Sequence, residues 1–296
     1  MSLTMPPLRG RRRWRQKSHP PETAKKTPLR RSHLLLQNPE RDIFFHIPLR
    51  RVEEFLPYLN HLKPNLEIYL DAPALEHLKG EGIHRVLNKL EYTPSFTIHG
   101  PFMDLSPGAV DPAIREVTMG RFNHALSIAH EIGAKVVVFH SGYERWKYDH
   151  NLQIWLDESI KTWEPLVKKA AEWEIGIAIE NIFETNPENL IALMESLKDD
   201  HFGLCFDTGH FNLFSEVSLS EWLSPLADRI LELHLHDNDG TRDHHWAPGK
   251  GDFDFSELFE ILGRRAKGKV VPVVEAHSKE EAEDAVKFFR ERASSS

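Results

Sequence analysis

The chain has 296 residues, of which 40% are hydrophobic and 28% are charged, with a formal net charge of -8 at pH 7. Such a chain can bury a large core, and one barrel of roughly 250 residues fits once a short N-terminal arm is set aside. No apolar stretch approaches the roughly 20 residues that span a bilayer, the basic N-terminus lacks the apolar core of a secretory signal, and Cys205 is the only cysteine. We therefore expect no membrane segment, no intramolecular disulfide and a cytoplasmic location.

The N-terminal arm, residues 1–41, differs in charge from the rest of the chain. It contains 11 Lys/Arg and 2 Asp/Glu, which leaves 26 basic and 43 acidic residues, a net charge of -17, in residues 42–296. Pro20, Pro21 and the absence of apolar periodicity predict a disordered arm that is dispensable for folding. Its arginines around Trp14 also suit an acidic partner, nucleic acid or an organellar targeting role.

Strand-like and helix-like segments alternate after the arm. Short apolar runs rich in Ile, Val and Phe are typical of buried parallel strands, and they lie at 42–48, 65–71, 95–102, 135–141, 176–182, 203–208, 230–237 and 269–276. Amphipathic segments between them are expected to be helices, at 51–62, about 82–90, 112–132, 152–173 and 280–292. Asp111 is a candidate N-cap, because Pro112 suits the first turn of a helix.

Eight strand–helix units in one chain favour a closed (β/α)₈ TIM barrel over a doubly wound open sheet. The first strand is not followed by the Gly-x-Gly-x-x-Gly turn of a dinucleotide-binding fold. The predicted organisation is therefore a basic arm over residues 1–41 and a TIM barrel over residues 42–296.

Metal-ligating side chains recur where six consecutive predicted strands end, and in the loop after the seventh. They are His99, His140, Glu180, Asp207, His210, His236, Asp243, His245 and Glu275. The carboxyl ends of barrel strands converge on one mouth, so these side chains should lie within a single site. Carboxylates packed there without a counter-charge would repel one another and take up protons, whereas a divalent cation would satisfy them.

Imidazole and carboxylate groups without thiolate suit Zn²⁺, Mn²⁺ or Fe²⁺ better than Ca²⁺. One ion uses three or four protein groups and keeps an open position for water or substrate. Nine candidates therefore indicate either two or three bridged ions, or one ion together with catalytic and substrate-binding residues.

The strand ends resemble those of a known group of barrels, the xylose isomerase-like superfamily. The matching motifs are Asp207-Thr-Gly-His210, His236-Asp-Asn, Asp243-x-His245 followed by Pro-Gly-Lys-Gly251, and Glu275. The resemblance extends from about residue 42 to residue 292. This superfamily includes endonuclease IV, of AP endonuclease family 2, and many sugar isomerases and epimerases.

The resemblance implies roles for the candidate residues. In both branches, the positions of Glu180, Asp207, His236 and Glu275 hold a metal ion, and in the isomerase branch Glu180 and Glu275 also move protons. In the endonuclease IV branch a first zinc is bound by His99, His140 and Glu180. A further zinc in that branch is bound by His210, Asp243 and His245.

Two enzymatic functions compete on this evidence. The favoured one is a multi-metal phosphoester hydrolase acting on a small phosphorylated substrate, in which clustered ions generate hydroxide. The alternative is a metal-dependent sugar or sugar-phosphate isomerase or epimerase, with Glu180 and Glu275 as acid and base on a phosphorylated or polyol substrate. A third class is a metal-binding barrel without turnover.

The surroundings of the predicted site favour a small ligand over DNA. The barrel is acidic, whereas phosphate backbones are bound through Lys and Arg, and the DNA-inserting loops of endonuclease IV are not found. Lys250 and Arg242 are candidates to bind one phosphate or carboxylate group, and Trp246 is a candidate ring contact.

Overall fold

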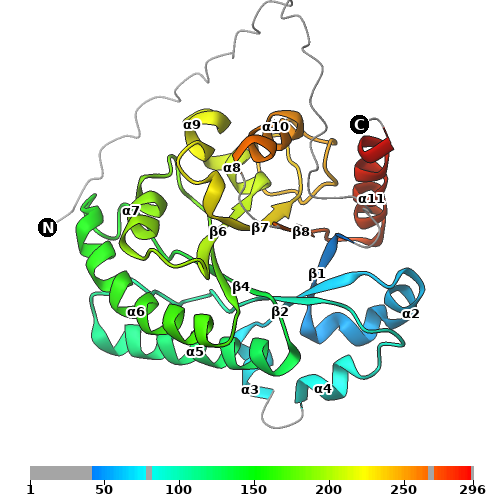
Figure 1. The fold of residues 1–296 in the computed structure, drawn as a ribbon, viewed down its shortest axis with the longest axis horizontal. Coiled ribbons are helices and arrows are strands. Elements are labelled where there is room, and N and C mark those ends of the chain that lie inside the picture. Colours follow the sequence, from blue (N-terminus) through cyan, green and yellow to red (C-terminus); the bar gives the residue numbers. More distant parts are fainter. Residues whose placement is uncertain (1–41, 78–81, 266–269, 295–296) are drawn as a thin grey trace, which may run out of the picture. The chain divides into compact units, whose positions relative to one another are not determined.

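The computed structural model describes residues 42–77, 82–265 and 270–294, so the predicted N-terminal arm lies outside the described residues. Eight parallel strands form a closed barrel in the order of the sequence (Figure 1), which confirms the predicted TIM barrel. The strands are β1 (Phe44–Pro48), β2 (Asn65–Tyr69), β3 (Phe96–His99), β4 (Val136–His140), β5 (Gly176–Glu180), β6 (Phe202–Asp207), β7 (Ile230–Leu235) and β8 (Val271–Val274).

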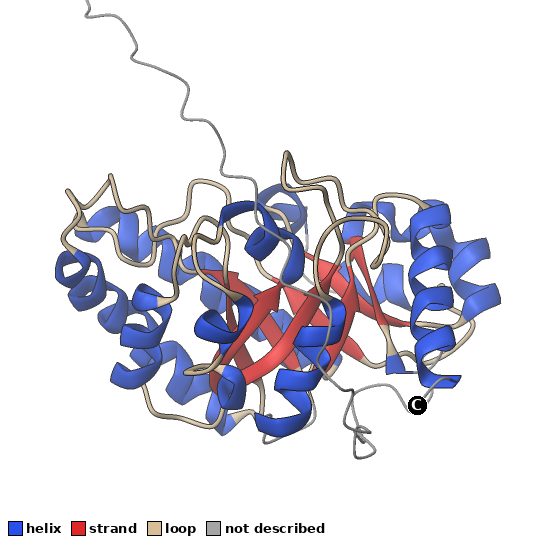
Figure 2. Cartoon of the chain, turned by 90° about the horizontal axis from the view of Figure 1, so that it is seen from above, coloured by secondary structure: helices blue, strands red, loops and turns tan. Residues whose placement is uncertain are grey.

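Helices flank the strands (Figure 2). They are η1 (Leu49–Arg51), α2 (Val52–Leu62), α3 (Ala72–His77), α4 (Gly82–Leu87), α5 (Pro112–Ile132), α6 (Leu152–Glu172), α7 (Glu188–Ser196), α8 (Thr208–Phe214), α9 (Leu219–Leu223), η2 (Ala227–Arg229), α10 (Phe255–Arg265) and α11 (Lys279–Ser294). Among the described residues, no helix is long and apolar enough to cross a membrane.

The predicted helix boundaries hold best where the local signals are strong. Asp111 caps α5 by accepting a hydrogen bond from the backbone N–H of Ala113 at 2.8 Å, and Gly133 ends the helix in the left-handed conformation. The predicted 82–90 helix ends earlier, at Leu87. The predicted eighth strand, 269–276, shortens to Val271–Val274.

Alternation along the strands decides which side chains enter the barrel. Residues facing outward, such as Ile98, Phe139 and Ile177, belong to the main core between strands and helices. A second, smaller apolar cluster comprises Phe44, Val136, Val138, Ala178, Cys205, Val271, Val273 and the partly buried Leu231. Two residues beyond several members of this cluster, on the same face of each strand, lie His46, His140, Glu180, Asp207 and Glu275.

The barrel interior is not wholly apolar. Glu67, Thr97, Glu232 and His234 are all fully buried. They contact one another: Glu232 Oε1 lies 3.4 Å from Thr97 Oγ1 and 3.7 Å from His234 Nε2. Barrel interiors are usually filled by branched apolar side chains, so this polar group beneath the mouth is unusual.

Candidate metal centre and active site

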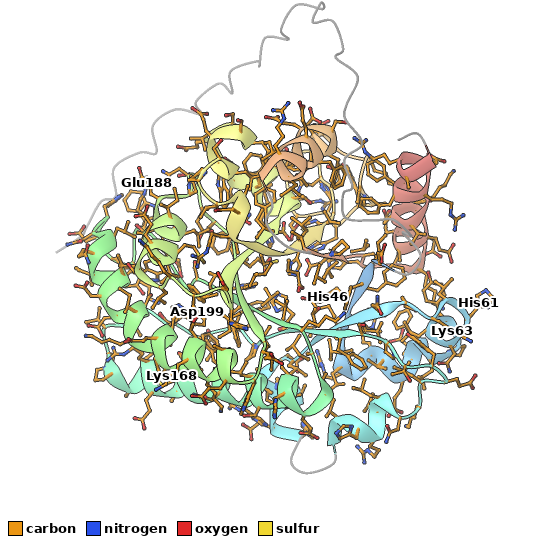
Figure 3. The ribbon with its side chains drawn as sticks, in the orientation of Figure 1. His46, His61, Lys63, Lys168, Glu188 and Asp199 are labelled. Carbon is orange, nitrogen blue, oxygen red and sulfur yellow. The ribbon has the colours of Figure 1, made fainter. Side chains whose placement is uncertain are left out.

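The structure brings all nine candidate residues into one network of contacts at the carboxyl ends of the strands. Figure 3 shows His46 within the ring of helices, whereas His61 and Lys63 lie at its periphery. His46, which lies near the end of β1, adjoins this network through Glu275. The network has three parts, centred on Glu180, on Asp207 with His236, and on Asp243.

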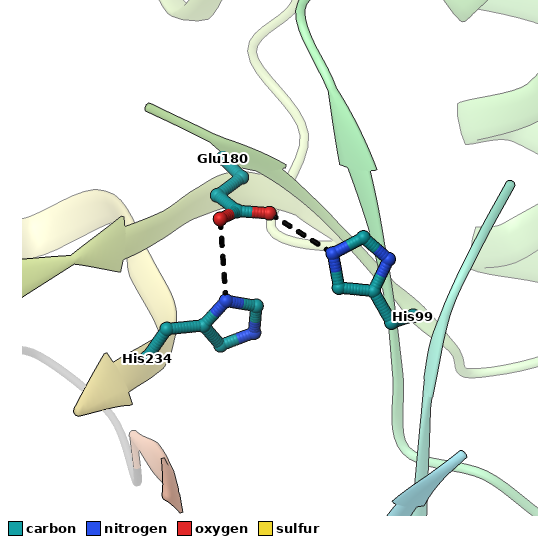
Figure 4. A group of neighbouring side chains, drawn as sticks. All are labelled: His99, Glu180 and His234. Atoms are coloured by element: carbon teal, nitrogen blue, oxygen red, sulfur yellow. Dashed lines mark hydrogen bonds and ion pairs between the residues drawn. The ribbon is translucent and has the colours of Figure 1, made fainter. Parts of the chain in front are cut away.

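Glu180 is the central carboxylate. Its Oε2 atom lies 3.1 Å from Nε2 of His99 and 3.2 Å from Nε2 of His140. Its Oε1 atom lies 3.2 Å from Nδ1 of His210 and 3.4 Å from Nδ1 of His234. Figure 4 shows His99 and His234 approaching different oxygens of this carboxylate. Glu180 therefore joins imidazoles from four other segments of the barrel, which is the geometry that a bridging carboxylate needs.

Asp207 both caps a helix and faces an imidazole. Its Oδ1 accepts the backbone N–H of His210 at 2.6 Å and so caps α8, while its Oδ2 lies 2.9 Å from Nε2 of His236. Gly209 permits this arrangement, because a Cβ there would lie 2.1 Å from Cε1 of His236. The Asp-Thr-Gly-His motif thus packs a helix start directly against an imidazole.

Asp243 organises the loop that follows β7. Its Oδ2 atom lies 2.8 Å from Nε2 of His245 and 3.6 Å from Nε2 of His210. Its Oδ1 atom lies 3.6 Å from Nδ1 of His236. His245 has a φ of 52°, a left-handed conformation that is uncommon for residues other than glycine and that concentrates at functional sites.

The three residues predicted to bind substrate contact side chains that do not belong to the nine candidate residues. The Lys250 ammonium lies 3.0 Å from Glu281 and 2.7 Å from Asp284, both on α11. Arg242 is exposed and contacts Nε2 of His244 at 2.8 Å. Trp246 stacks on His244 with ring centroids 4.1 Å apart.

Sequence reasoning missed His46, Glu67 and Asp237. His46 lies near the end of a predicted strand, as the other candidates do, so the same rule could have found it. Glu67 is a charged residue within an apolar strand, which was the available signal. Asp237 is fully buried, and its carboxylate accepts the backbone N–H groups of Gly249, Gly251 and Phe253, which fixes the loop after β7.

The electrostatics of the site couple carboxylates to imidazoles. Burial opposes ionisation of Glu180, but His234 and His140 outweigh it, so the pKa of Glu180 lies well below its usual value. Glu275 is also buried, yet His234, His46 and His245 lower its pKa to about 2. Burial disfavours charge on His245, but Asp243 and Glu275 raise its pKa to about 9. Protonated imidazoles thus balance carboxylates, the role that a cation would otherwise fill.

The side chains present fit divalent metal. Ligand atoms of His99, Glu180 and His234, of Asp207, His210 and His236, and of His236, Asp243 and His245 each lie within 4.8 Å of one another. The buried Nδ1 atom of His236 has no hydrogen-bond partner in the described part of the chain, although it faces Asp243. A buried polar atom without a partner is costly, and a cation bound between Asp243 and His236 would give this nitrogen a partner.

Comparison with known proteins gives relatives and similar structures. The uncharacterized protein MJ1311 of Methanocaldococcus jannaschii is 29% identical over 178 residues, which are 58% of this chain and 61% of that protein. The match therefore spans about three fifths of the relative's length.

Two solved structures cover most of the chain. The TTHB071 protein from Thermus thermophilus, soaked with ZnCl₂, has a TM-score of 0.71 and 27% identity over 86% of this chain and 99% of its own. A D-tagatose 3-epimerase-like protein has a TM-score of 0.69 and 23% identity, over 83% of this chain and 96% of its own. The family model of the xylose isomerase-like TIM barrel matches residues 65–292. The chain belongs to the xylose isomerase-like TIM barrel family.

Proposed function

We propose that this protein is a metal-dependent epimerase or isomerase of a small sugar or polyol, with Glu180 and Glu275 as its acid and base. The observation that carries the proposal is that Oε1 atoms of both carboxylates lie 3.4 Å from the same atom, Nδ1 of His234. These two oxygens are therefore at most 6.8 Å apart, so one small molecule at the barrel mouth can contact both carboxylates. Proton transfer at a substrate carbon needs two such groups within reach of one molecule.

The similar folds favour this function over the phosphoester hydrolase that the sequence favoured. The D-tagatose 3-epimerase-like protein shares the fold across most of this chain. We propose Zn²⁺ or Mn²⁺ as the cofactor, held by Glu180, Asp207, His236 and Glu275, because mixed nitrogen and oxygen ligands suit both ions. The ion supplies Lewis acidity that polarises neighbouring substrate oxygens.

The protein's own groups handle the proton. In an epimerisation, one carboxylate removes the proton from the carbon beside a carbonyl, and the other, in its protonated form, returns a proton to the opposite face. The pair thus gains and loses one proton per turnover. The lowered pKa values of Glu180 and Glu275 leave both carboxylates ionised at neutral pH, so either can act as the base, and the partner has to take up a proton from solvent before it acts as the acid.

The rim of the site favours an uncharged or weakly charged substrate. Lys250 is engaged by Glu281 and Asp284 on α11, so Arg242 remains the proposed anion contact and Trp246 the proposed ring contact. A polyol chain can bind through the many carboxylate and imidazole groups at the mouth.

A multi-metal hydrolase is the second candidate, and one observation favours it. Asp243 Oδ2 contacts both His245 and His210, while His99 and His140 share Glu180 Oε2. These are two further ligand groups beside the proposed epimerase ion. Clustered ions are what hydrolytic attack on a phosphoester needs.

Metal content and turnover distinguish the two functions. For the epimerase we expect about one tightly held ion per chain, turnover of ketoses, and an unchanged ion content in His140→Ala. Glu180→Gln should abolish turnover, since an amide cannot carry the proton. His61→Ala, a change at an exposed residue of α2, is the matched control. Two or three ions per chain, loss of one in His140→Ala, and turnover of phosphodiesters alone would establish the hydrolase instead.

A further inference from the structure

A buried carboxylate beneath the mouth holds two imidazoles. Glu67 on β2 is fully buried. Its Oε2 atom lies 2.6 Å from Nδ1 of His46, and its Oε1 atom lies 3.2 Å from Nε2 of His234. The two oxygens of Glu67 therefore face different rings, and the two rings come from strands on either side of β8.

Both imidazoles also reach the same atom at the mouth. Nδ1 of His46 lies 3.2 Å from Oε1 of Glu275, and Nδ1 of His234 lies 3.4 Å from that oxygen. Glu67, His46, Glu275 and His234 thus form a closed circuit. The other oxygen of Glu275, Oε2, faces away from this circuit, toward His245 at 3.6 Å and His236 at 3.9 Å.

This division of the two oxygens gives Glu67 a role beyond packing. A carboxylate that approaches a metal must present one oxygen in a fixed direction, and groups behind the ligand set that direction. The interior side of Glu275 is occupied by the two rings that Glu67 holds. A buried ion pair is seldom more stable than apolar packing of the same volume, so stability alone does not account for Glu67 in a barrel interior that also holds Phe44, Val138 and Val273.

We propose that Glu67 is a positioning residue of this site, which acts through His46 and His234 to fix the direction of the Glu275 carboxylate and thereby strengthens binding of the divalent ion. The inference rests on the proposed function, in which Glu275 is both a metal ligand and a proton carrier.

The test compares two isosteric changes in the same buried layer of the full-length protein. Glu67→Gln removes the charge between the two rings. Glu232→Gln is the matched control: Glu232 is equally buried and contacts Glu67, but its contact with His234 is longer, at 3.7 Å, and within the described residues it makes no contact with His46 or Glu275. Affinity for Mn²⁺ is measured by competition with a chelating dye. We expect Glu67→Gln to bind Mn²⁺ about 10- to 100-fold more weakly, the usual cost of losing such a supporting group, and Glu232→Gln to stay within about threefold of the wild type.

A double variant tests whether Glu67 acts through His46. If it does, Glu67→Gln combined with His46→Leu should weaken Mn²⁺ binding by less than the product of the two single effects, because both changes break one chain of contacts. His46 lies at the mouth and contacts Glu275 directly, so if Glu67→Gln fails to fold, His46→Leu tests whether the His46 arm of the circuit supports the ion. Equal losses in Glu67→Gln and Glu232→Gln, or Mn²⁺ affinities of Glu67→Gln and His46→Leu within about threefold of the wild type, would overturn the proposal.

Turnover separates this inference from the proposed function. With Mn²⁺ at saturation, a misdirected Glu275 should lower kcat for a ketose more than it changes KM, since the substrate-binding rim is intact. If the wild type turns over no ketose while Glu67→Gln still loses Mn²⁺ affinity, the epimerase is wrong and the positioning role stands. If the wild type is active and Glu67→Gln matches it in affinity and kcat, the positioning role is wrong.

Discussion

Replacing Gly209 with alanine adds one methyl group directly against a proposed metal ligand. The new Cβ would lie 2.1 Å from Cε1, 2.4 Å from Nδ1 and 2.8 Å from Nε2 of His236, where ordinary contacts are 3.4–4 Å. The helix start cannot easily retreat, because Asp207 caps it and Thr208 Oγ1 contacts the carbonyl oxygens of His234 and His236. The imidazole of His236 must therefore move.

The size of that movement decides the outcome. The ring has to withdraw by at least about 1.3 Å to bring the 2.1 Å approach to an ordinary contact of 3.4 Å, whereas metal–nitrogen bonds tolerate changes of only about 0.2 Å. His236 would thus be lost as a ligand. Overpacking by itself is expected to cost about 1–3 kcal/mol of folding free energy.

Thermal unfolding with and without metal measures both effects. A ligand at about 100 times its Kd stabilises a protein by about 2.7 kcal/mol, and Gly209→Ala should lose most of that increment, with less ion found by elemental analysis. Gly120→Ala is the control, because Gly120 lies within α5 and a Cβ there meets nothing within 4 Å. It should stabilise the protein by about 0.5–1 kcal/mol and leave the metal increment unchanged. An unchanged ion content and metal increment in Gly209→Ala would refute the reasoning.

Other outcomes can be checked on the same protein. Asp237→Ala leaves four backbone N–H groups of the loop after β7 without their acceptor, so unfolding in urea should show a loss of about 3 kcal/mol or more, and a loss below about 1 kcal/mol would contradict this. The raised pKa of His245, about 9 against an ordinary 6.5, means that its stabilisation is complete below pH 6.5 and is lost as pH rises through 9. Metal-free protein should therefore lose up to about 3 kcal/mol of stability over that range, and a His245→Gln variant with the same pH profile would contradict the assignment. A chain that starts near Glu40 should melt within a few degrees of the full chain, and insolubility would show that the arm supports the barrel.

Local signals were sufficient for the barrel and for the positions of most strand ends. The two-residue period of a strand and the caps of a helix such as α5 depend on neighbours in sequence, so they can be read without the fold. The same period explains why Glu180 and Asp207, each two residues after a small inward-facing side chain, reach the mouth. The convergence of the nine candidate residues follows from barrel topology, which places the ends of parallel strands together.

The amino-acid sequence by itself did not decide whether this site catalyses hydrolysis or epimerisation. The motif residues occur in both branches of the resemblance, and the loops that select a substrate have no local code. Metal stoichiometry is the measurement that separates the two.

Only the tertiary structure revealed the partners of several charged residues. Lys250 lies within the Pro-Gly-Lys-Gly251 motif, yet its ammonium contacts Glu281 and Asp284, because α11 packs beside that loop. Glu67 and His234 are 167 residues apart and meet inside the barrel. The sequence by itself determined which side chains stand at the strand ends. Which side chains lie behind them depends on the closure of β1 on β8, and a contact made by closure leaves no pattern along the chain.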